Sequence, residues 1–436
     1  MKRIKYSILL LLLTQAVFAQ EILTKSEAVK LALEFNYDIK VANNSVEIAK
    51  NNSDIMNSGY LPRLSTRAGV NYSRRSVQRD SDDGIVFAAG GNTYTYNSAL
   101  ELSYTLFDGL GRQYTFQQAR GTAELSELQA RQIIEQALLQ LFSAYYEVAR
   151  LTENEISQKQ SLEISKDRLL RAKYGYDYGQ NTQLDVLNAE VDVNNDSIDY
   201  LTIIQQLENA KRDLNLLLGR EVNVLFTVDT TVFYLRGLTL EDVVTDAKKR
   251  NVTVLQADKL IQNSQYDINI IRANWLPRVD LSASYDWSST NYDEAANFPD
   301  QSIYGPLAGV NLSWDLFDGG LTKTRIQNSK IALESERIAK ERTQQQLYRN
   351  LNNAWTVYET ALFVLDAQRK NLETNQVNFD RTLEQYKLGQ ITSIVFRQAQ
   401  VNLVNAQLSF NEAKYQAKIA EIALLQLSGN LLDSEF

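Results

Sequence analysis

The side chains that most often perform acid–base or metal chemistry are missing from this chain. His and Cys do not occur among its 436 residues, whereas Asp and Glu together number 53. The chain therefore lacks the commonest general base, the commonest transition-metal ligand and any thiolate or disulfide. Carboxylates are among the groups that remain for acid–base or cation chemistry, so we examine the acidic segments first.

Two acidic segments could in principle hold a cation. The segment Asp192-Val-Asn194-Asn-Asp196 begins like a calcium loop, but Ser197 stands where glycine is required and Ile203 where the last Glu belongs. The segment Asp80-Ser-Asp82-Asp83-Gly84 is expected to be a solvated loop between two strands, with weak divalent binding as the less favoured alternative. We therefore predict no metal site in either segment.

Asp108 and Asp318 could be taken for catalytic carboxylates. Each stands just before a glycine at the start of a helical pattern, where a short acidic side chain caps the first backbone N–H groups. We therefore expect N-caps at two strand–helix junctions, formed by Phe107, Asp108, Gly109, Phe317, Asp318 and Gly319.

The first 19 residues have the pattern of a secretory signal peptide. Lys2, Arg3 and Lys5 precede a short apolar run, and Val17-Phe18-Ala19 suits cleavage before Gln20. Without these 19 residues the net charge changes from −8 to −11, which disfavours nucleic acid as a partner. No later apolar run reaches the 18 residues of a transmembrane helix, so any crossing of a membrane would be made by β-strands.

One motif occurs twice. Leu102-Ser103 and Leu106-Phe107-Asp108-Gly109 return 210 residues later in 312–319, and the same offset pairs Gly179 with Gly389 and Gly219 with Gly429. Upstream, an offset of 215 pairs Leu-Pro-Arg at 61–63 with Leu-Pro-Arg at 276–278, and Asn36 with Asn251. Offsets that persist in this way predict an internal duplication.

The duplication divides the chain into two similar parts. We expect a first repeat at 20–219, a linker at 220–237, a second repeat at 238–429 and a short tail at 430–436. Each repeat should contain a helix, a β-hairpin (about 63–107 and about 278–317), a long helix, a turn at 179 or 389, and a returning helix.

The long helix of each repeat exceeds those of ordinary globular domains. In 111–173, apolar residues recur at the alternating three- and four-residue spacing of a coiled-coil seam: Ile134, Ala137, Leu141, Ala144, Val148 and Leu151. The segment 321–387 has the same character, and each helix would span about 100 Å. Gly179 and Gly389 suit left-handed C-caps, and Thr182 and Thr392 suit the N-caps of the returning helices.

Four segments alternate apolar and polar residues with a period of two: 64–73, 94–106, 279–288 and 304–316. Their apolar faces carry Tyr and Trp, while the other faces carry Arg67, Glu101 and Asp280. About ten residues is the length of a tilted strand that crosses a bilayer, with one face toward lipid and one toward a wet lumen. The alternative is a soluble antiparallel sheet with one buried face.

Four strands cannot close a wall in lipid, so several chains would have to assemble. Two chains would supply 8 strands and three would supply 12, and the physical argument does not choose between them.

In combination, these features resemble the TolC-type outer-membrane efflux protein family, the outer membrane factors. The resemblance rests on the duplication, on Leu-Pro-Arg before each first strand, on Leu-Phe-Asp-Gly after each second strand, and on the Tyr-x-x-Gly turns at 176–179 and 386–389. It implies an α+β membrane protein in the outer membrane, a homotrimer whose four strands per chain form a 12-stranded β-barrel. The helices would form a periplasmic α-barrel.

The resemblance also implies a function and partners. Such a channel-tunnel is no enzyme, holds no cofactor, and gives passive exit in a tripartite efflux or type I secretion system. It would work with a periplasmic adaptor (membrane fusion) protein and an inner-membrane transporter of RND, ABC or MFS type. The periplasmic tips that meet the adaptor would be Tyr178, Gly179, Gln180, Asn181, Thr182, Leu388, Gly389, Gln390, Ile391 and Thr392.

Asp185 has two interpretations. Some family members place acidic residues near this position to narrow the entrance, but here the second copy has Val395 at the matching site. Asp185 also fits a capping box with Thr182, which we favour.

A second hypothesis for the whole chain is a non-conducting trimeric coiled-coil adhesin or periplasmic spacer. Adhesins place their membrane strands once, at the C-terminus, whereas here the hairpins occur twice and lie mid-chain.

Overall fold

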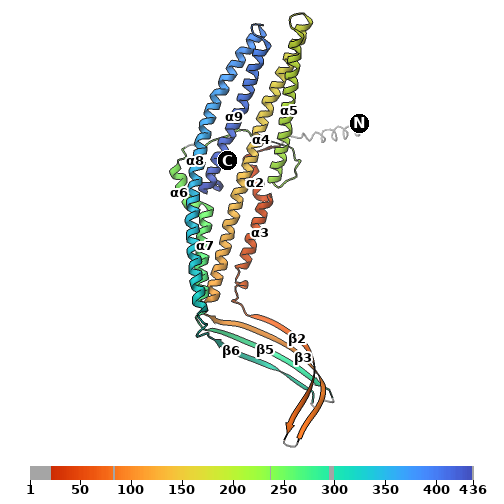
Figure 1. Ribbon diagram of the computed structural model, residues 1–436, viewed down its shortest axis with the longest axis vertical. Helices are drawn as coiled ribbons and strands as arrows, with labels where there is room; N and C mark the ends of the chain where they lie inside the picture. The colour runs from red at the N-terminus through yellow and green to blue at the C-terminus, as the bar shows by residue number, and fades with distance from the viewer. Residues whose placement is uncertain (1–20, 82–83, 236, 294–298, 435–436) are drawn as a thin grey trace, which may run out of the picture. The chain divides into compact units, whose positions relative to one another are not determined.

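The computed structural model describes residues 21–81, 84–235, 237–293 and 299–434 (Figure 1). The predicted signal peptide at 1–19 lies outside the described residues. The chain divides into two compact units. The helical unit comprises 1–44, 128–255 and 342–436, and the strand unit comprises 45–127 and 256–341.

The helices of the chain fall into two matching sets. The first set is α2 (Lys25–Phe35), α3 (Tyr37–Asn52), α4 (Gly111–Asp177) and α5 (Gln183–Leu217), and the second is α6 (Leu240–Arg250), α7 (Val252–Ala273), α8 (Leu321–Lys387) and α9 (Ser393–Ser428). Helices α4 and α8 have 67 residues each, which corresponds to about 100 Å. Short 3₁₀ helices occupy Ile55–Asn57 and Leu431–Asp433. In the described part of the chain, no helix is long and apolar enough to span a membrane.

The main core of the helical unit forms along α4. Leu141, Val148 and Leu151 of the predicted seam are at most 2% exposed. They pack with residues of α2, α5 and α9 and with the two-stranded parallel sheet of β1 (Glu21–Leu23) and β4 (Phe226–Val228). The apolar seam is therefore buried between helices, as its spacing predicts. β4 is a short strand within the segment between the repeats.

A break in each N-terminal helix was not predicted from the sequence. Asn36 separates α2 from α3, its Oδ1 accepting from Asp38 N at 2.9 Å, while its Nδ2 donates to Leu217 O at 2.8 Å. Asn251 separates α6 from α7 in the same way, and its Nδ2 donates to Leu427 O at 3.0 Å. One amide thus starts a new helix and satisfies a carbonyl at the end of the returning helix.

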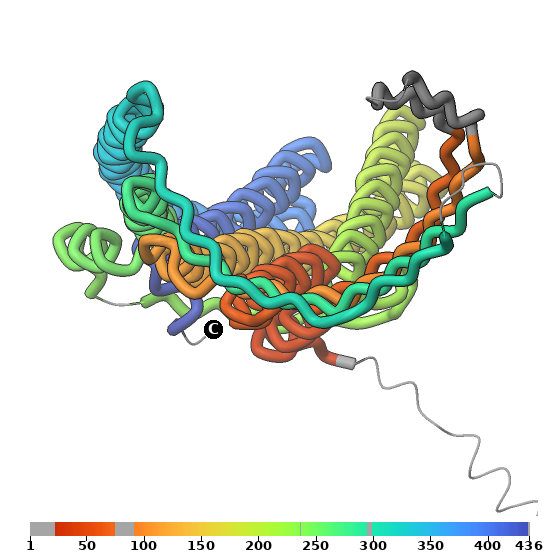
Figure 2. Tube along the Cα trace, turned by 90° about the horizontal axis from the view of Figure 1, so that it is seen from below, coloured from red at the N-terminus to blue at the C-terminus, as the bar shows by residue number. Residues whose placement is uncertain are grey.

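The strand unit contains one antiparallel sheet in the order β2-β3-β5-β6. Its strands are β2 (Arg63–Ser81), β3 (Gly84–Asp108), β5 (Arg278–Tyr292) and β6 (Gln301–Ser313). The strands follow a wide arc (Figure 2). Side-chain bonds cross between strands on the polar face, such as Arg67–Glu101 at 2.9 Å and Thr105–Asp280 at 2.7 Å. The repeats are joined where β3 pairs with β5.

Several strand bounds differ from the sequence expectation. β2 and β3 extend well beyond 64–73 and 94–106. Asp80, Ser81 and Gly84 of the expected acidic loop belong to strands, and Asp82 and Asp83 lie outside the described residues.

The second hairpin ends earlier than the expected 317, because β6 stops at Ser313. Ser313 pairs with Arg278, the first residue of β5, so 314–317 have no neighbouring strand within the described sheet. The matching residues of β3 do pair with β5, Phe107 with Val279 and Asp108 with Arg278.

Candidate functional site

The first helical turn joins α4 to α5. Gly179 adopts φ +75°, which a residue with a side chain seldom adopts. Gln180 N donates to Gly175 O at 2.6 Å and Gly179 N to Tyr176 O at 2.9 Å, so the last carbonyls of α4 are satisfied. A Cβ on Gly175 would lie 2.3 Å from Asn181 Nδ2, so the turn closes tightly over the helix end.

Thr182 and Asp185 begin α5 with a reciprocal capping box, as predicted. Thr182 N donates to Asp185 Oδ2 at 2.9 Å, and Asp185 N donates to Thr182 Oγ1 at 3.3 Å. Hydrogen bonds from the Thr182 hydroxyl and backbone hold the pKa of the Asp185 carboxyl below its usual value. Asp185 therefore stays ionised at neutral pH and serves the helix end.

The second turn joins α8 to α9 with the same backbone and a different chemistry. Gly389 adopts φ +71°, and Gln390 N donates to Gln385 O at 2.9 Å. Thr392 caps α9 by accepting from Val395 N at 3.4 Å, but Val395 cannot return a bond. Behind the turn, Ile391 packs with Tyr386, Phe379 and Phe396, and the Tyr386 and Phe396 rings stack at 4.7 Å. Side chains at the first turn are therefore joined by hydrogen bonds, whereas side chains behind the second turn are joined by apolar packing.

Both turns expose large apolar side chains at matching positions. Tyr178 is 81% exposed and its counterpart Leu388 is 73% exposed. Leu184 and its counterpart Ile394 are 64% and 71% exposed. The turns therefore present apolar residues at well-capped helix ends.

The first turns of the two returning helices, α5 and α9, line one groove. Asp185 and Asp192 of α5 and Ser393, Ile394 and Arg397 of α9 line a groove of about 350 Å³. The structure thus brings Asp185 of the first turn to the same place as the start of the second returning helix.

An ionic network begins at this groove, extends into the core and connects α9 to α4 and α5. Arg397 Nη2 lies 2.7 Å from Asp196 Oδ1, and its Nε lies 3.4 Å from Asp192 Oδ1. Arg168 of α4 is 1% exposed and pairs with Asp192, while Ser165 donates to Asp196 Oδ2 at 2.5 Å. Two arginines and two aspartates are therefore held together across three helices.

The network gives two residues of the rejected calcium loop a different role. Asp192 and Asp196 lie within helix α5 and face arginines. Burial lowers the pKa of Arg168, opposed by Asp192 and reinforced by the nearby Arg397 cation. Sequence reasoning missed this network because its members come from three helices, and no local spacing links 168 or 196 to 397.

At the strand–helix junctions, Asp108 and Asp318 lie two residues before the N-cap positions that we predicted for them, but their carboxylates still accept from the first turn of each helix. Asp108 Oδ2 accepts from Arg112 N at 2.9 Å, and Asp318 Oδ2 accepts from Thr322 N at 2.7 Å. Gly109 (φ +67°) has no room for a side chain, because a Cβ there would lie 2.5 Å from Ala273 O. Gly319 has a similar φ of +69° and open space around it. Phe107 lies within β3, one residue before its end at Asp108, whereas Phe317 is 86% exposed in the connection to α8.

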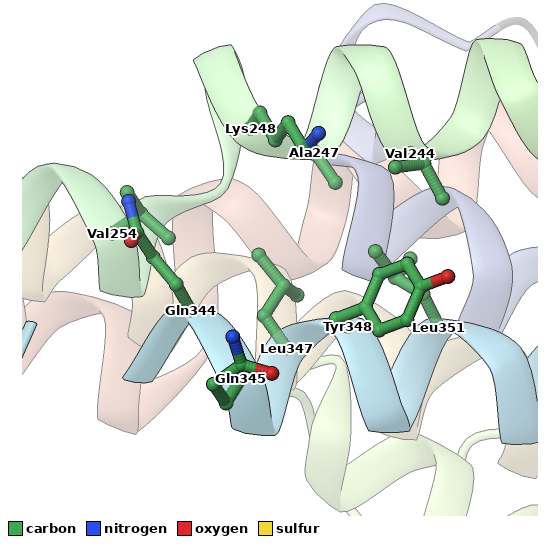
Figure 3. Close-up of a pocket in the computed structure, with 9 residues that line it drawn as sticks. All are labelled: Val244, Ala247, Lys248, Val254, Gln344, Gln345, Leu347, Tyr348 and Leu351. Carbon is green, nitrogen blue, oxygen red and sulfur yellow. The ribbon is translucent and has the colours of Figure 1, made fainter. Parts of the chain in front are cut away.

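An open groove of about 460 Å³ runs between α6, α7 and α8 (Figure 3). Its lining is mainly apolar and aliphatic, with Lys248 and Tyr348 as its titratable groups and Gln344 and Gln345 as amides. No pair of carboxylates or acid–base partners converges in this groove. Within the described residues, no cluster of three or more acidic side chains could hold a metal ion either.

Comparison with known proteins shows the family. Residues 28–220 and 243–430 match the family described as "Outer membrane efflux protein". The chain is 22% identical over 413 residues to the outer membrane efflux protein BepC of Brucella suis, with 94% of this chain and 86% of BepC covered. It is 23% identical over 394 residues to the outer membrane protein TolC of Vibrio cholerae, covering 87% and 84% of the two chains.

The fold is that of solved channels of the same kind. The crystal structure of the Campylobacter jejuni CmeC outer membrane channel superposes with a TM-score of 0.75 at 17% identity, covering 93% of this chain and 86% of that one. This likeness confirms the predicted fold class of long helical hairpins and a β domain contributed by several chains.

Function, location and partners follow from the family. The chain is an outer-membrane channel-tunnel of a tripartite export system, with its helical part in the periplasm. It acts as a homotrimer with a periplasmic adaptor and an inner-membrane transporter, as predicted. The adhesin or spacer alternative is not favoured. With matches over both halves, this chain belongs to the outer membrane efflux protein family.

Proposed function

We propose that the two helical turns, 178–182 and 388–392, are the surface that docks the periplasmic adaptor, and that the chain serves as an exit duct without catalysing a reaction. The observation that carries the docking proposal is the pair of exposed apolar side chains on each turn. Tyr178 with Leu184, and Leu388 with Ile394, occupy matching positions in the two repeats. Exposed apolar patches on soluble surfaces commonly mark protein contacts.

The caps of both turns support docking. Each turn has a left-handed glycine that closes its first helix and a threonine that caps the returning one. A capped turn loses little conformational entropy when it is bound, so its exposed side chains can contribute more of their burial to affinity.

Asp185 is better assigned to the cap than to a constriction of the entrance. Its carboxylate bonds Thr182 twice, through backbone N at 2.9 Å and hydroxyl at 2.7 Å. A side chain held in this way is not free to reach across a lumen, and the second repeat has Val395 in its place.

The absence of catalysis is proposed from the chemistry of the described grooves. The 460 Å³ groove holds one lysine and no carboxylate, and the half-buried Asp192 and the buried Asp196 are paired with arginines. A general acid–base pair needs two groups of differing pKa within reach of one substrate, and neither place offers them.

We also propose that the structural repeats run from 20 to 219 and from 238 to 429, with 220–237 between them. Mirrored details support these bounds. Asn36 bonds Leu217 O as Asn251 bonds Leu427 O. A Cβ on Gly219 would collide with Phe35, and one on Gly429 with Arg250.

The docking proposal is tested by photo-crosslinking in the cell envelope. A photoreactive amino acid at position 178 or 388 should capture the adaptor, and one at exposed Ile331, on α8 within the strand unit, should not. Replacement of Tyr178 and Leu388 by Ser should lower adaptor capture and raise sensitivity to exported toxic compounds, with unchanged amounts of trimer. Equal capture from 178, 388 and 331 would show that the turns are not the docking surface.

A further inference from the structure

Another pocket lies within the strand unit, where the end of the sheet meets the helices. It has a volume of about 350 Å³. Its walls come from the end of β3, the start of α4, the last turn of α7, the start of β5 and the residues that follow β6. Every lining residue belongs to this one unit, so the pocket is complete within it.

The charged side chains of the pocket balance each other. Arg112 and Arg278 contribute two cations, and Asp108 and Asp315 contribute two carboxylates. Asp108 is already engaged, because its Oδ2 accepts from Arg112 Nε at 3.1 Å. Asp315 is exposed, and within the described residues its carboxylate makes neither a hydrogen bond nor an ion pair. The pocket therefore offers a free carboxylate although it is neutral as a whole.

Arg278 offers a free N–H group in a fixed orientation. Its Nε donates to Asp280 Oδ2 at 2.8 Å, and its Nη2 donates to Thr105 Oγ1 at 3.1 Å. Nη1 of this guanidinium has no partner among the described residues. Because two bonds already hold the side chain, an anionic oxygen can bind at Nη1 with little further loss of side-chain entropy.

The ends of two helices add opposite partial charges to the pocket. α4 begins at Gly111 and α7 ends at Ala273, and the two ends are close, since a Cβ on Gly111 would lie 3.3 Å from Ala273 Cβ. The start of a helix favours negative charge and the end of a helix favours positive charge. The pocket therefore suits a ligand that carries both an anionic and a cationic group.

An apolar stripe leads from the pocket along β6. Trp314 lines the pocket, and Leu312 and Val310 continue its face of the strand; they are 53%, 63% and 63% exposed. Trp314 is held in place because its Nε1 donates to Trp275 O at 3.0 Å. Trp side chains favour the boundary between membrane and water, and this apolar face is the one expected toward lipid.

We propose that this pocket binds the headgroup of a zwitterionic phospholipid with a primary amine, from the periplasmic leaflet of the outer membrane. The phosphate accepts from Arg278 Nη1, and the ammonium group donates to Asp315. The acyl chains lie along the apolar stripe of Trp314, Leu312 and Val310.

Three features select this occupant. The free Asp315 carboxylate attracts an ammonium group and repels a second negative charge, so a zwitterion is favoured over a purely anionic ligand. The adjoining apolar stripe suits acyl chains. The pocket lies at the periplasmic end of the membrane strands, which is the level of the headgroups. The proposal rests on the location of the sheet in the outer membrane and not on adaptor docking.

Native mass spectrometry of the purified full-length trimer tests the site. Phosphatidylethanolamine should bind more tightly than phosphatidylglycerol, which has the phosphate and no amine. Asp315→Asn should weaken phosphatidylethanolamine by roughly tenfold, because a charge-assisted hydrogen bond is lost, and should not weaken phosphatidylglycerol. Glu341→Gln is the matched control, because Glu341 is an exposed acid on α8 outside the pocket, and it should change neither lipid.

The phosphate half of the site is tested independently. Arg278→Gln with Asp280→Asn removes the guanidinium without leaving its carboxylate partner unpaired, and both lipids should bind more weakly. This variant also decides if Asp315→Asn fails to assemble. Soluble glycerophosphoethanolamine, which has the headgroup and no acyl chains, should not displace bound lipid at equal concentration.

Four outcomes would overturn the proposal. They are equal affinity for the two lipids in the unaltered trimer, an equal effect of Asp315→Asn and Glu341→Gln, and unchanged binding of both lipids in the Arg278 and Asp280 variant. The fourth is displacement by glycerophosphoethanolamine at equal concentration, which would assign the pocket to a soluble phosphate compound and not to a membrane lipid.

Discussion

Replacement of Asp196 by Ala should loosen α9 from α4 and α5. Asp196 is 4% exposed and accepts from Arg397 through both carboxylate oxygens, at 2.7 and 2.8 Å, and from Ser165. Without this carboxylate, Arg397 and Arg168 share Asp192 alone. The buried guanidinium of Arg168 and the half-buried one of Arg397 beside a single carboxylate leave a positive charge without compensation.

The expected cost is about 3 kcal/mol. Removal of one partner of a buried ion pair typically costs 3–5 kcal/mol, and the low end applies because the Arg397 side chain is 19% exposed. At about 1.4 kcal/mol for each factor of ten, 3 kcal/mol corresponds to roughly a hundredfold rise in the population of the locally opened state.

Amide hydrogen exchange in the detergent-solubilised trimer measures this opening directly. Amides of α9 near Arg397 and of α5 near Asp196 should exchange about a hundredfold faster, because their exchange reports the local opening equilibrium. Arg397→Met in the Asp196→Ala background removes the uncompensated charge and should restore at least half of the lost free energy.

Glu163→Ala is the matched control. Glu163 pairs with Lys166 at 2.8 Å, but the two side chains are 63% and 51% exposed. Exposed pairs contribute about 0–1 kcal/mol, so exchange should rise less than fivefold. If Asp196→Ala also raises exchange less than fivefold, the network behaves as a surface pair and the reasoning from burial is refuted.

Three further outcomes are expected at the helix ends. Thr182→Ala should destabilise the first turn of α5 by about 1 kcal/mol, seen as faster exchange of its first amides. Hydrogen bonds from Thr182 lower the pKa of Asp185, so the cap stabilises the start of α5 at neutral pH and is lost as pH falls through a folded pKa below the usual 3.8. Exchange of the first α5 amides should therefore rise in acid, and this rise should disappear in Thr182→Ala. Gly219→Ala should lower the free energy of unfolding by roughly 2–5 kcal/mol, because φ is +68° and a Cβ would lie 2.2 Å from the carbonyl oxygen of Phe35. Gly179 has open space around it, so Gly179→Ala should lower it by only about 1–2 kcal/mol. Similar melting temperatures of the two variants would contradict this.

The fold was largely predictable because its signals are local and repeated. The seam of α4 has a helical period over six apolar positions, and the four strands have a period of two over ten or more residues. Glycine and threonine mark both turns in the sequence, and Gly179, Thr182 and Asp185 adopt the predicted cap geometry.

Strand ends were less predictable because a partner strand decides them. The same Leu-Phe-Asp-Gly motif continues β3 at 106–108 but lies beyond the end of β6 at 316–319. β3 has β5 beside it at that point, whereas β5 begins only at Arg278 and leaves nothing for 314–317 to pair with. Pairing is a tertiary property, and identical local sequence cannot encode two outcomes.

The polar network at Arg397 was out of reach for a related reason. Its members lie on α4, α5 and α9, and each residue taken alone resembles any charged residue on a helix. The helix breaks at Asn36 and Asn251 could have been found, because the two asparagines share the offset of the repeat and each precedes a new run of helical pattern. The signal was present in the comparison of the copies and absent from either copy alone.

The duplication separates residues that serve the backbone from residues that serve a particular neighbour. Positions where both copies keep one residue type meet a local demand: Gly179 and Gly389 need a left-handed backbone, and Gly219 and Gly429 need space. Positions where the copies differ face different neighbours, as Asn154 faces Asn411 while Val364 is exposed. A position that is polar and buried in one repeat, and apolar and exposed in the other, therefore reports on its neighbours and not on the backbone that the repeats share.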